Sequence, residues 1–348
     1  MPLTSTERVT GASPVTAGKG GAVTVLVTGG AGYIGAHIVR TLQDAGTAVV
    51  VADDLSTGVA ARVPDVPMLR ADLSDRGTVP ALAAFMTRHD VDAVVHMSGL
   101  KRADESVAQP VRYYQQNVGQ TANVLLAMEA AAVRGLVFSS SAAVYGETTA
   151  APVRECDATR PVNPYGATKL ACEDLLRWAA AAGRVDVIAL RYFNVAGADR
   201  PELADTSRIN LLSILVARLR AGLPPVVYGD DYPTPDGTCV RDYVHVQDLA
   251  DAHILALRRT TAAGFRVFNI GTGTGTSVLE MVAALGTASG CRVEPVRAPR
   301  RPGDPAFVVA SAEAFARATG WSPRRTVDDM VRSTLASVAA SSSGGSGA

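Results

Sequence analysis

Short apolar runs rich in valine, isoleucine and leucine alternate with longer segments of helical periodicity along the first half of the chain. Five of these runs predict buried strands: residues 23–28, 48–53, 93–97, 136–140 and 187–192. Segments between the runs, such as residues 121–132 and 167–181, predict helices. Strand and helix in alternation indicate a parallel sheet, because parallel strands need long crossover connections, which are almost always right-handed.

The alternation breaks up after Phe193, where proline- and glycine-rich stretches such as residues 222–237 predict a smaller, loop-rich lobe. We therefore predict an α/β chain with a Rossmann-type doubly wound parallel sheet and a smaller mixed α/β substrate-binding lobe. The predicted parts are a flexible extension at 1–21, the sheet domain at 22–193, the second lobe at 194–338 and a flexible tail at 339–348. Some strand or helix of the second lobe is expected to return to the first domain.

The composition indicates a globular protein with a sizeable core, since 47% of the 348 residues are hydrophobic. Basic and acidic side chains balance at 33 each, which argues against a nucleic-acid binder or a polybasic membrane binder. No apolar run of about 18 residues predicts a transmembrane helix, and the N-terminus lacks the apolar block of a signal peptide. Four cysteines without a Cys-x-x-Cys pair indicate a reduced, cytoplasmic protein with neither a metal site nor disulfides.

The first predicted strand runs into TGGAGYIG (residues 28–35), a variant of the dinucleotide-binding fingerprint. Gly29 permits a tight turn, Gly32 lets the backbone approach a diphosphate, and Gly35 lets the next helix pack on the strand. The N-terminus of that helix then presents free N–H groups to the anion. Glycines also occur in ordinary turns, but this triplet follows a strand and opens a helix, which favours dinucleotide binding.

Asp53 ends the second predicted strand, 18 residues after Gly35. A carboxylate there suits the two hydroxyls of an adenosine ribose and would repel a 2′-phosphate, so NAD is favoured over NADP. Asp72 follows the next apolar run, where it could receive the adenine or could instead cap a helix.

The motif NPYGATK begins a predicted helix and places Tyr165 and Lys169 four residues apart, on one face. A free tyrosine has a pKa of about 10, too high for a base at neutral pH. A nearby ammonium and a cationic nicotinamide would both lower that pKa. Ser141, at the end of a strand, offers a hydroxyl to the same substrate oxygen. Tyr165 and Lys169 could instead serve packing, and Ser141 could simply form a turn. The dinucleotide-binding loop earlier in the chain favours a catalytic role for all three.

Together these motifs resemble the extended short-chain dehydrogenase/reductase superfamily and, within it, the UDP-glucose 4-epimerase family. The resemblance covers about residues 23–335 and rests on TGGAGYIGAH, DDLSTG, H-x-x-GLK with ESV, YYQQNV, FSSSAAVYG, NPYGATK, RYFN, DYPTPDGTCVRDYVHVQDLADAH, NIGTG and PRRPGD. It implies C4 epimerisation between UDP-glucose and UDP-galactose through a 4-keto intermediate, with bound NAD. It also implies a homodimer through a helix pair in the first lobe.

The resemblance assigns residues to the two ligands. It implies that NAD is contacted by Gly29, Gly32, Tyr33, Ile34, Gly35, Asp53, Asp72, Leu73, Lys101, Asn117, Tyr165, Lys169 and Tyr192. It implies that the UDP-sugar is met by Ser141, Tyr165, Asn194, Asn210, Leu211, Tyr228, Arg241, Arg301 and Asp304. Arginine forks suit a diphosphate, although surface ion pairs are the alternative for Arg241 and Arg301. Tyr228 could stack on uracil or pack in the core.

Lysine is scarce, which gives two of these positions added weight. The chain has three lysines among 33 basic residues, and 33 − 3 leaves 30 arginines. Coding bias accounts for the excess of arginine. Lys101 and Lys169 nevertheless fall at cofactor positions, and Lys19 lies in the predicted flexible extension. Retained lysine there indicates a need for a compact ammonium rather than a planar guanidinium.

Differences from the sequences of related enzymes narrow the range of activities that this chain is expected to have. Dehydratases carry an Asp-Glu pair after the hydroxyl residue and decarboxylases a glutamate, whereas this chain has Ala142 and Ala143, which disfavours both. The small Val308, where some relatives have tyrosine, suggests tolerance of UDP-GlcNAc and UDP-GalNAc. RAD at 102–104 and a short segment at 198–208 are expected to affect sugar-side contacts and loop closure. A pentose or uronate 4-epimerase and a non-catalytic NAD sensor remain alternatives.

Overall fold

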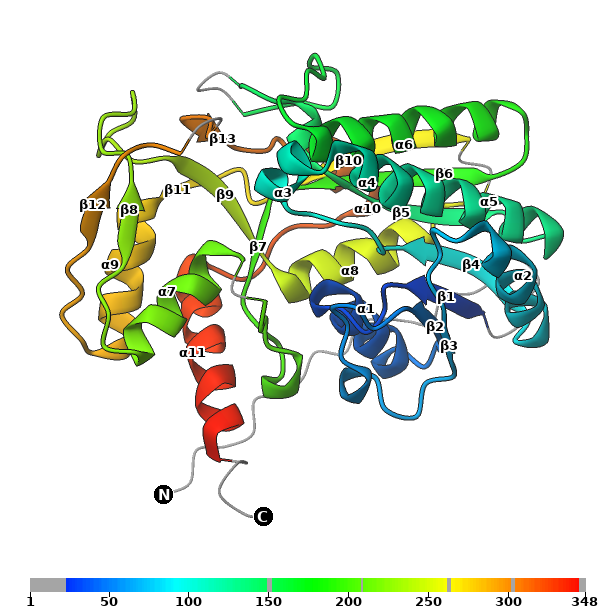
Figure 1. The fold of residues 1–348 in the computed structure, drawn as a ribbon, viewed down its shortest axis with the longest axis horizontal. Coiled ribbons are helices and arrows are strands. Elements are labelled where there is room, and N and C mark those ends of the chain that lie inside the picture. Colours follow the sequence, from blue (N-terminus) through cyan, green and yellow to red (C-terminus); the bar gives the residue numbers. More distant parts are fainter. Residues whose placement is uncertain (1–22, 149–151, 208, 262–263, 302–303, 344–348) are drawn as a thin grey trace.

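The structure is a computed structural model that describes residues 23–148, 152–207, 209–261, 264–301 and 304–343. The chain forms two lobes, with the large sheet in one and shorter strands in the other (Figure 1). Residues 1–21, predicted as a flexible extension, lie outside the described residues, as do residues 344–348 of the predicted tail. Helix α11 (Val327–Ser343) continues through the first five residues of that tail, 339–343.

The first lobe is built on a seven-stranded sheet in the order β10-β6-β5-β4-β1-β2-β3, and every pairing in it is parallel. Its strands are β1 (Thr24–Thr28), β2 (Ala48–Asp53), β3 (Met68–Arg70), β4 (Val91–His96), β5 (Gly135–Ser141), β6 (Asp186–Tyr192) and β10 (Phe265–Ile270). Strand order reverses between β1 and β4, which creates a crevice at their carboxyl ends. The predicted doubly wound sheet is confirmed.

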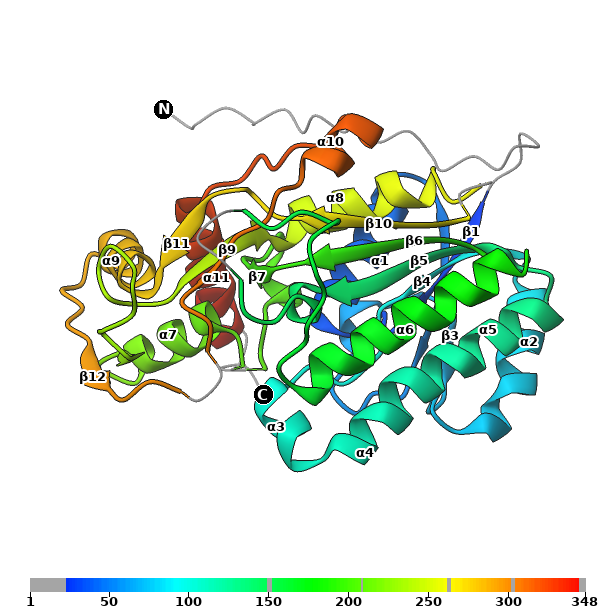
Figure 2. The same cartoon turned by 90° about the horizontal axis from the view of Figure 1, so that it is seen from above.

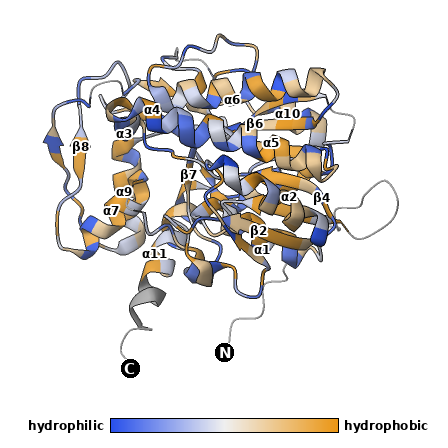
Figure 3. Ribbon diagram, turned by 45° about the vertical axis from the view of Figure 1, so that its right-hand side comes forward, coloured by the Kyte–Doolittle hydropathy of each residue, from blue (hydrophilic) through white to orange (hydrophobic). Residues whose placement is uncertain are grey.

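Helices cover both faces of this sheet because its strands are apolar on both sides. On one face lie α2 (Val79–Arg88), α5 (Gln120–Ala130) and α6 (Pro164–Ala181); on the other lie α1 (Tyr33–Asp44) and α8 (Val246–Leu257). Figure 2 shows α5 and α6 lying side by side across the first of these faces. The strands are the most hydrophobic part of the lobe in Figure 3. Alternate residues of β1 supply the two cores: Val25 and Val27 face one, and Leu26 faces the other.

The second lobe has its own small core. Strand β9 (Val240–His245) pairs with β11 (Gly275–Ser277), β13 (Phe307–Val308) and β7 (Asn194–Ala196), while β8 (Val226–Tyr228) pairs with β12 (Val296–Ala298). Helices α7 (Leu211–Arg220) and α9 (Val278–Ser289) enclose apolar side chains with α11. Within the segment 194–338, β10 joins the large sheet and α8 packs against α1, so the chain does return to the first lobe.

Short elements complete the connections. They are η1 (Ala60–Arg62), η2 (Arg76–Thr78), α3 (Ala103–Ala108), α4 (Pro110–Tyr113), the π-helical η3 (Tyr114–Gly119), η4 (Ala142–Val144), η5 (Pro201–Leu203) and α10 (Glu313–Thr319). No helix in the described ranges is both long and apolar enough to cross a membrane.

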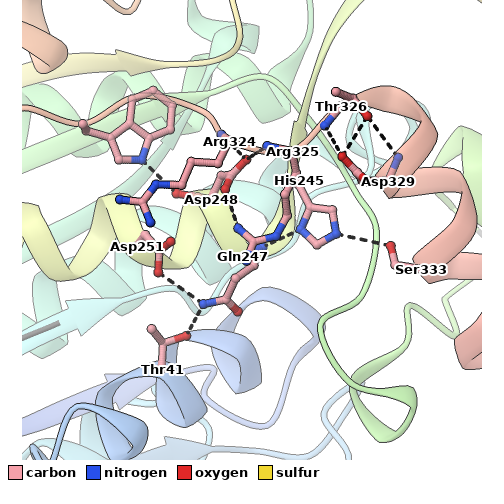
Figure 4. Close-up of polar contacts among 11 residues, drawn as sticks. Thr41, His245, Gln247, Asp248, Asp251, Arg324, Arg325, Thr326, Asp329 and Ser333 are labelled. Atoms are coloured by element: carbon pink, nitrogen blue, oxygen red, sulfur yellow. Dashed lines mark hydrogen bonds and ion pairs between the residues drawn. The ribbon is translucent and has the colours of Figure 1, made fainter. Parts of the chain in front are cut away.

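A polar network at the start of α8 joins the two lobes (Figure 4). The ring of His245 accepts a hydrogen bond from the Gln247 backbone N–H at 3.1 Å, and the Gln247 side chain donates to the Thr41 hydroxyl of α1 at 3.0 Å. The buried Asp248 accepts backbone N–H groups of Arg324 and Arg325 at 3.0 and 2.9 Å, just before α11. The C-terminal helix is therefore fixed to the helix that lines the large sheet.

Candidate active site

A cavity of about 500 Å³ lies at the carboxyl ends of the central strands, in the crevice between β1 and β4. Its walls come from the loops after β1, β2, β3 and β4 and from the ends of β5 and β6. All but two of the predicted NAD residues line it: Gly29, Gly32, Tyr33, Ile34, Gly35, Asp53, Leu73, Lys101, Tyr165, Lys169 and Tyr192. The size and position are those of a dinucleotide site.

The glycine loop has the backbone geometry that its sequence predicts. Gly29 has φ +66°, a conformation that favours glycine, and a Cβ there would meet the Ser98 backbone nitrogen at 2.9 Å. A Cβ on Gly35 would lie 2.2 Å from the Gly29 carbonyl oxygen, so only glycine lets α1 pack this closely. Gly32 precedes α1 without a side-chain cap, which leaves the first N–H groups of the helix available to an anion.

Asp53 is buried at the end of β2, where its two carboxylate oxygens accept the Ala31 and Leu55 backbone N–H groups at 3.0 and 2.8 Å. Each oxygen keeps a further lone pair for a ribose hydroxyl. Burial raises the pKa of Asp53, and the two backbone hydrogen bonds oppose that rise. The neighbouring Asp54 also lines the cavity, and two acids in one wall suit hydroxyl groups better than a 2′-phosphate.

Asp72 and Asn117 are the two predicted NAD residues that the cavity wall does not include. One Asp72 oxygen accepts both the backbone N–H and the hydroxyl of Ser74, at 2.8 and 2.7 Å. The buried Asn117 amide bonds the Leu100 backbone at both of its ends and donates to the Thr168 hydroxyl at 2.9 Å. Asn117 thus ties the loop after β4 to helix α6, one layer behind the cavity.

Helix α6 carries the tyrosine–lysine pair and begins where the motif predicts. The Asn163 side chain accepts the Gly166 backbone N–H at 2.9 Å, and Pro164 occupies the first turn. Tyr165 and Lys169 both face the cavity. The buried Lys169 ammonium donates to the Ser139 carbonyl oxygen at 2.9 Å and lies 5.0 Å from the Phe138 ring centroid.

The electrostatics of the pair differ from the expectation that the lysine lowers the tyrosine pKa. Burial raises the pKa of Tyr165, and a hydrogen bond with the Ser141 hydroxyl opposes the rise. Burial also lowers the pKa of Lys169, whose ammonium is turned toward the β5 backbone. In this state Ser141, rather than Lys169, is the group that favours the phenolate. Ser141 and Tyr165 are therefore brought together as predicted.

A buried ion pair between Glu173 and Arg191 joins helix α6 to the sheet. Glu173, one turn after Lys169, accepts two hydrogen bonds from the Arg191 guanidinium at 2.9 and 2.6 Å. The Ser140 hydroxyl donates to the same carboxylate at 2.5 Å. Because Ser140 precedes Ser141 and Arg191 precedes Tyr192, this pair fixes α6 against the two strands that reach the cavity. Sequence reasoning did not assign either member.

Apart from Tyr165, the predicted UDP-sugar residues do not line this cavity, and most of them lie in the second lobe. The Arg301 guanidinium stacks on the Tyr228 ring at 3.9 Å from its centroid. Arg241 lies 3.7 Å from Asp304, in the ion pair that was the alternative to substrate binding. Tyr228 is 38% exposed, so its ring can meet a ligand and does not belong to the core. Arginines suited to a diphosphate and an aromatic face suited to a base are thus both present in this lobe.

The remaining predicted substrate residues are spread over several elements. Asn194 begins β7, Asn210 and Leu211 begin α7, and Val308 lies in β13 opposite Arg241. The Asn210 amide donates to Asp205 at 2.6 Å. Val308 is 9% exposed and packs in an apolar cluster with Tyr145 and Phe193.

The second lobe also contributes to the cofactor cavity, which was not predicted. Asp205, Thr206, Ser207 and Ile209 line it, and buried Arg62 donates to the Ala204 carbonyl and the Thr206 hydroxyl at 2.7 and 3.1 Å. The segment 198–208 was expected to affect sugar-side contacts and loop closure, and Arg62 in addition holds part of it against the cofactor cavity. The sequence gives no sign of this, since Arg62 and Ala204 lie 142 residues apart.

The loop before α3 differs from the family motif at residues 102–104 but still lines the cavity. Arg102 lines the wall and pairs with Asp104 at 2.6 Å, both on the exposed side. Tyr113 donates to Glu105 at 3.0 Å and accepts the Arg102 backbone N–H at 3.0 Å. The unusual arginine and aspartate therefore neutralise each other at the mouth of the site.

The glycine loop, the buried acid at the end of β2 and the tyrosine–lysine pair on α6 are the arrangement of a Rossmann-fold enzyme that uses a dinucleotide. Residues 25–271 match the NAD dependent epimerase/dehydratase family, and the chain belongs to this family. The family assignment confirms NAD as the predicted cofactor.

Individual relatives agree with the family. The chain is 45% identical to a UDP-glucose 4-epimerase of Azospirillum brasilense, covering 89% of this chain and 90% of the relative. A solved UDP-glucose 4-epimerase from Stenotrophomonas maltophila, with bound NAD and formylated UDP-arabinopyranose, is 42% identical with a TM-score of 0.87. That alignment covers 92% of this chain and 99% of the other. A Bifidobacterium longum UDP-glucose 4-epimerase in complex with NAD+ and UDP gives a TM-score of 0.85 at 36% identity, covering 92% and 100%. The predicted resemblance is confirmed.

Proposed function

We propose that this protein interconverts UDP-glucose and UDP-galactose by inverting carbon 4, with NAD held in the cavity as a permanent cofactor. The observation that carries the proposal is Tyr165, hydrogen-bonded to Ser141 and directed into the cavity beside Lys169. A poised proton-transfer pair at the end of a dinucleotide cavity serves oxidation of a hydroxyl, and a mere NAD sensor would have no use for it.

Several features of the cavity fit NAD. The N-terminus of α1 is free to meet the diphosphate, and Asp53 is placed for the adenosine ribose. NAD supplies a hydride acceptor that can later return the same hydride. Lys101, in the loop after β4, also lines the wall and offers a cation to the cofactor.

In the proposed reaction, Tyr165 removes the proton of the sugar 4-hydroxyl while the hydrogen on carbon 4 leaves as hydride. Ser141 holds the same oxygen and stabilises the phenolate form of Tyr165. Lys169 is fixed by the Ser139 carbonyl close to the cofactor end of the cavity. The 4-keto sugar then turns about its bond to the diphosphate, and hydride and proton return to the opposite face. Atoms and electrons balance, so no further oxidant is needed.

The second lobe would anchor the UDP part, which must stay bound while the sugar turns. Arg301 and Tyr228 form one contact surface, and Arg241 with Asp304 forms another. Binding energy concentrated on the nucleotide leaves the sugar free to rotate. A UDP-Glc/GlcNAc 4-epimerase from Campylobacter jejuni is 34% identical with a TM-score of 0.79, which supports N-acetylhexosamines as a second substrate class.

The protein is proposed to act as a cytoplasmic homodimer. Helices α5 and α6 lie side by side on the surface of the first lobe and expose Leu126 and Trp178, the latter at 75% (Figure 2). An exposed tryptophan beside other apolar side chains is typical of an interface. Light scattering of Trp178→Glu would test the assembly, with a shift from dimer to monomer expected.

The decisive test of function measures UDP-galactose conversion and bound NAD in the same sample. We expect turnover without added NAD in the wild-type protein. Tyr165→Phe should lower kcat by about 1,000-fold, because the proton acceptor is lost, while NAD content is kept. Tyr114→Phe, at an exposed tyrosine away from the cavity, is the matched control. An unchanged rate in Tyr165→Phe would overturn the assignment.

A further inference from the structure

One buried acceptor in the cofactor cavity has no partner among the described residues. Gln120 lies in the first turn of α5, is 6% exposed and lines the cavity. Its side-chain oxygen Oε1 makes no hydrogen bond within the part of the chain that the structure describes. A buried amide oxygen left alone costs free energy, so this atom is suited to a ligand donor.

A chain of hydrogen bonds determines that the oxygen of the Gln120 amide, and not its nitrogen, is the end without a partner. The Asp72 carboxylate can only accept, so the Ser74 hydroxyl donates to it at 2.7 Å. Ser74 must then accept from Gln116 Nε2, also at 2.7 Å. The remaining Gln116 oxygen accepts from Gln120 Nε2 at 2.9 Å. The relay therefore begins at a carboxylate and ends with an unused acceptor, Oε1, on a residue that lines the cavity.

The position of the relay identifies the part of the ligand that it meets. Ser74 and Leu73 follow β3, one strand beyond Asp53 on β2, which is placed for the adenosine ribose. Asn123 holds this loop by donating to the Leu73 carbonyl at 2.9 Å. Ala71 and Leu73 give the same part of the cavity an apolar wall suited to the face of a base. The base beyond that ribose carries one strong donor, its exocyclic amino group.

We propose that Gln120 binds the 6-amino group of adenine and that the Asp72–Ser74–Gln116 relay holds its amide in the accepting orientation. This assignment rests on NAD as cofactor and adds a base-reading residue to the site. The cavity would then select adenine over a base with a carbonyl at the same position.

The test compares NAD with nicotinamide hypoxanthine dinucleotide, in which a carbonyl replaces the amino group. Calorimetry on protein stripped of NAD should show tighter binding of NAD by about 10- to 100-fold, since two acceptors would face each other in the hypoxanthine complex. Gln120→Met should weaken NAD binding and reduce that ratio to about threefold or less. Gln115→Met, an exposed glutamine in the same segment, is the matched control and should keep the ratio.

Two further variants test whether the relay orients the Gln120 amide or whether these side chains only pack against the cavity. Ser74→Ala removes the hydroxyl that orients both glutamines, so the ratio should fall while the melting temperature stays within a few degrees. If Asp72→Asn abolishes the preference and Gln120→Met leaves it intact, Asp72 reads the base directly and the proposal is wrong. Equal weakening of both dinucleotides by Gln120→Met would also overturn it. These are binding measurements, so they stand whether or not the epimerase activity is found.

Discussion

The two halves of the site are built in different ways. The cofactor half is formed by loops that follow neighbouring strands along the edge of one sheet. A short motif after each strand therefore supplies residues that line the cavity. The nucleotide-sugar half draws on β7, β8, β9, α7 and the loop that carries Arg301. The first half is prearranged by sheet topology, whereas the second depends on how separate segments pack. We therefore expect substitutions in the first half to abolish chemistry and those in the second to weaken binding.

Among the substitutions that compare the two halves, the largest effect is expected in the cofactor half, at Lys169. Lys169→Arg should reduce kcat by about 100-fold, because a planar guanidinium cannot take the place of an ammonium held by one backbone carbonyl in a buried slot. Steady-state kinetics with UDP-galactose measures this. Lys19→Arg is the matched control, since Lys19 lies at neither cofactor position and should keep normal turnover. Near-normal turnover of Lys169→Arg would contradict the argument that lysine is retained at this position because a compact ammonium is needed.

Arg301 tests the nucleotide-sugar half. Arg301→Ala should raise KM for UDP-galactose by about 10- to 50-fold, because a charged hydrogen bond to the diphosphate is lost. The NAD content and kcat should change little. Arg300→Ala is the matched control, since the neighbouring guanidinium stacks on Tyr232 and pairs with Asp231. A fall in NAD content in Arg301→Ala would contradict the division into two halves.

Acid should destabilise the cofactor half through His96, which is buried between the Thr28 and Thr121 hydroxyls. Burial lowers the pKa of His96 from 6.5 to about 3. Between these values the unfolded chain binds the proton and the folded chain does not, so the contribution to stability is complete above pH 6.5 and is lost as pH falls. From pH 7 to 5 this amounts to about 2 kcal/mol.

Urea unfolding of wild type and His96→Gln at both pH values isolates this effect. The neutral glutamine should remove about 2 kcal/mol of the pH dependence, whatever it does to stability at pH 7. An identical pH dependence in the two proteins would mean that His96 is not held neutral by burial.

The smallest effect concerns the choice of sugar. Val308 is small and packs beside Tyr145 and Phe193, so we expect the wild-type protein to epimerise UDP-GlcNAc as well as UDP-glucose. Val308→Tyr should reduce the UDP-GlcNAc rate by about fivefold relative to UDP-glucose, because the added ring occupies space near the sugar. Circular dichroism checks that the variant is folded. No detectable UDP-GlcNAc turnover in the wild type would refute the role of Val308.

Much of the fold could be predicted because its signals are local. The run at 48–53 coincides with β2, and the other four predicted strands agree with the observed ones within about two residues at each end. The glycine spacing and the Tyr165–Lys169 spacing needed only helix and strand geometry. These features lie within single motifs, so no long-range packing enters their prediction.

The unpredicted features depend on residues that are distant in sequence. Glu173 in α6 and Arg191 in β6 lie 18 residues apart, and Gln116 meets Ser74 across 42 residues. A glutamine or arginine at such a position looks like any surface residue until the fold brings its partner into reach. The burial that raises the pKa of Tyr165 and the backbone hydrogen bond of Lys169 are tertiary properties, so the local motif does not contain them.

The most direct test of the account follows the hydrogen on carbon 4. UDP-galactose carrying deuterium at that carbon would be converted in ordinary water, and the UDP-glucose formed would be analysed by mass spectrometry and NMR. The account predicts that the product keeps its deuterium at carbon 4 with no exchange into solvent, because the hydride is carried by the bound cofactor and returned to the same carbon. Loss of the deuterium to water would contradict transient oxidation at carbon 4 and with it the proposed function.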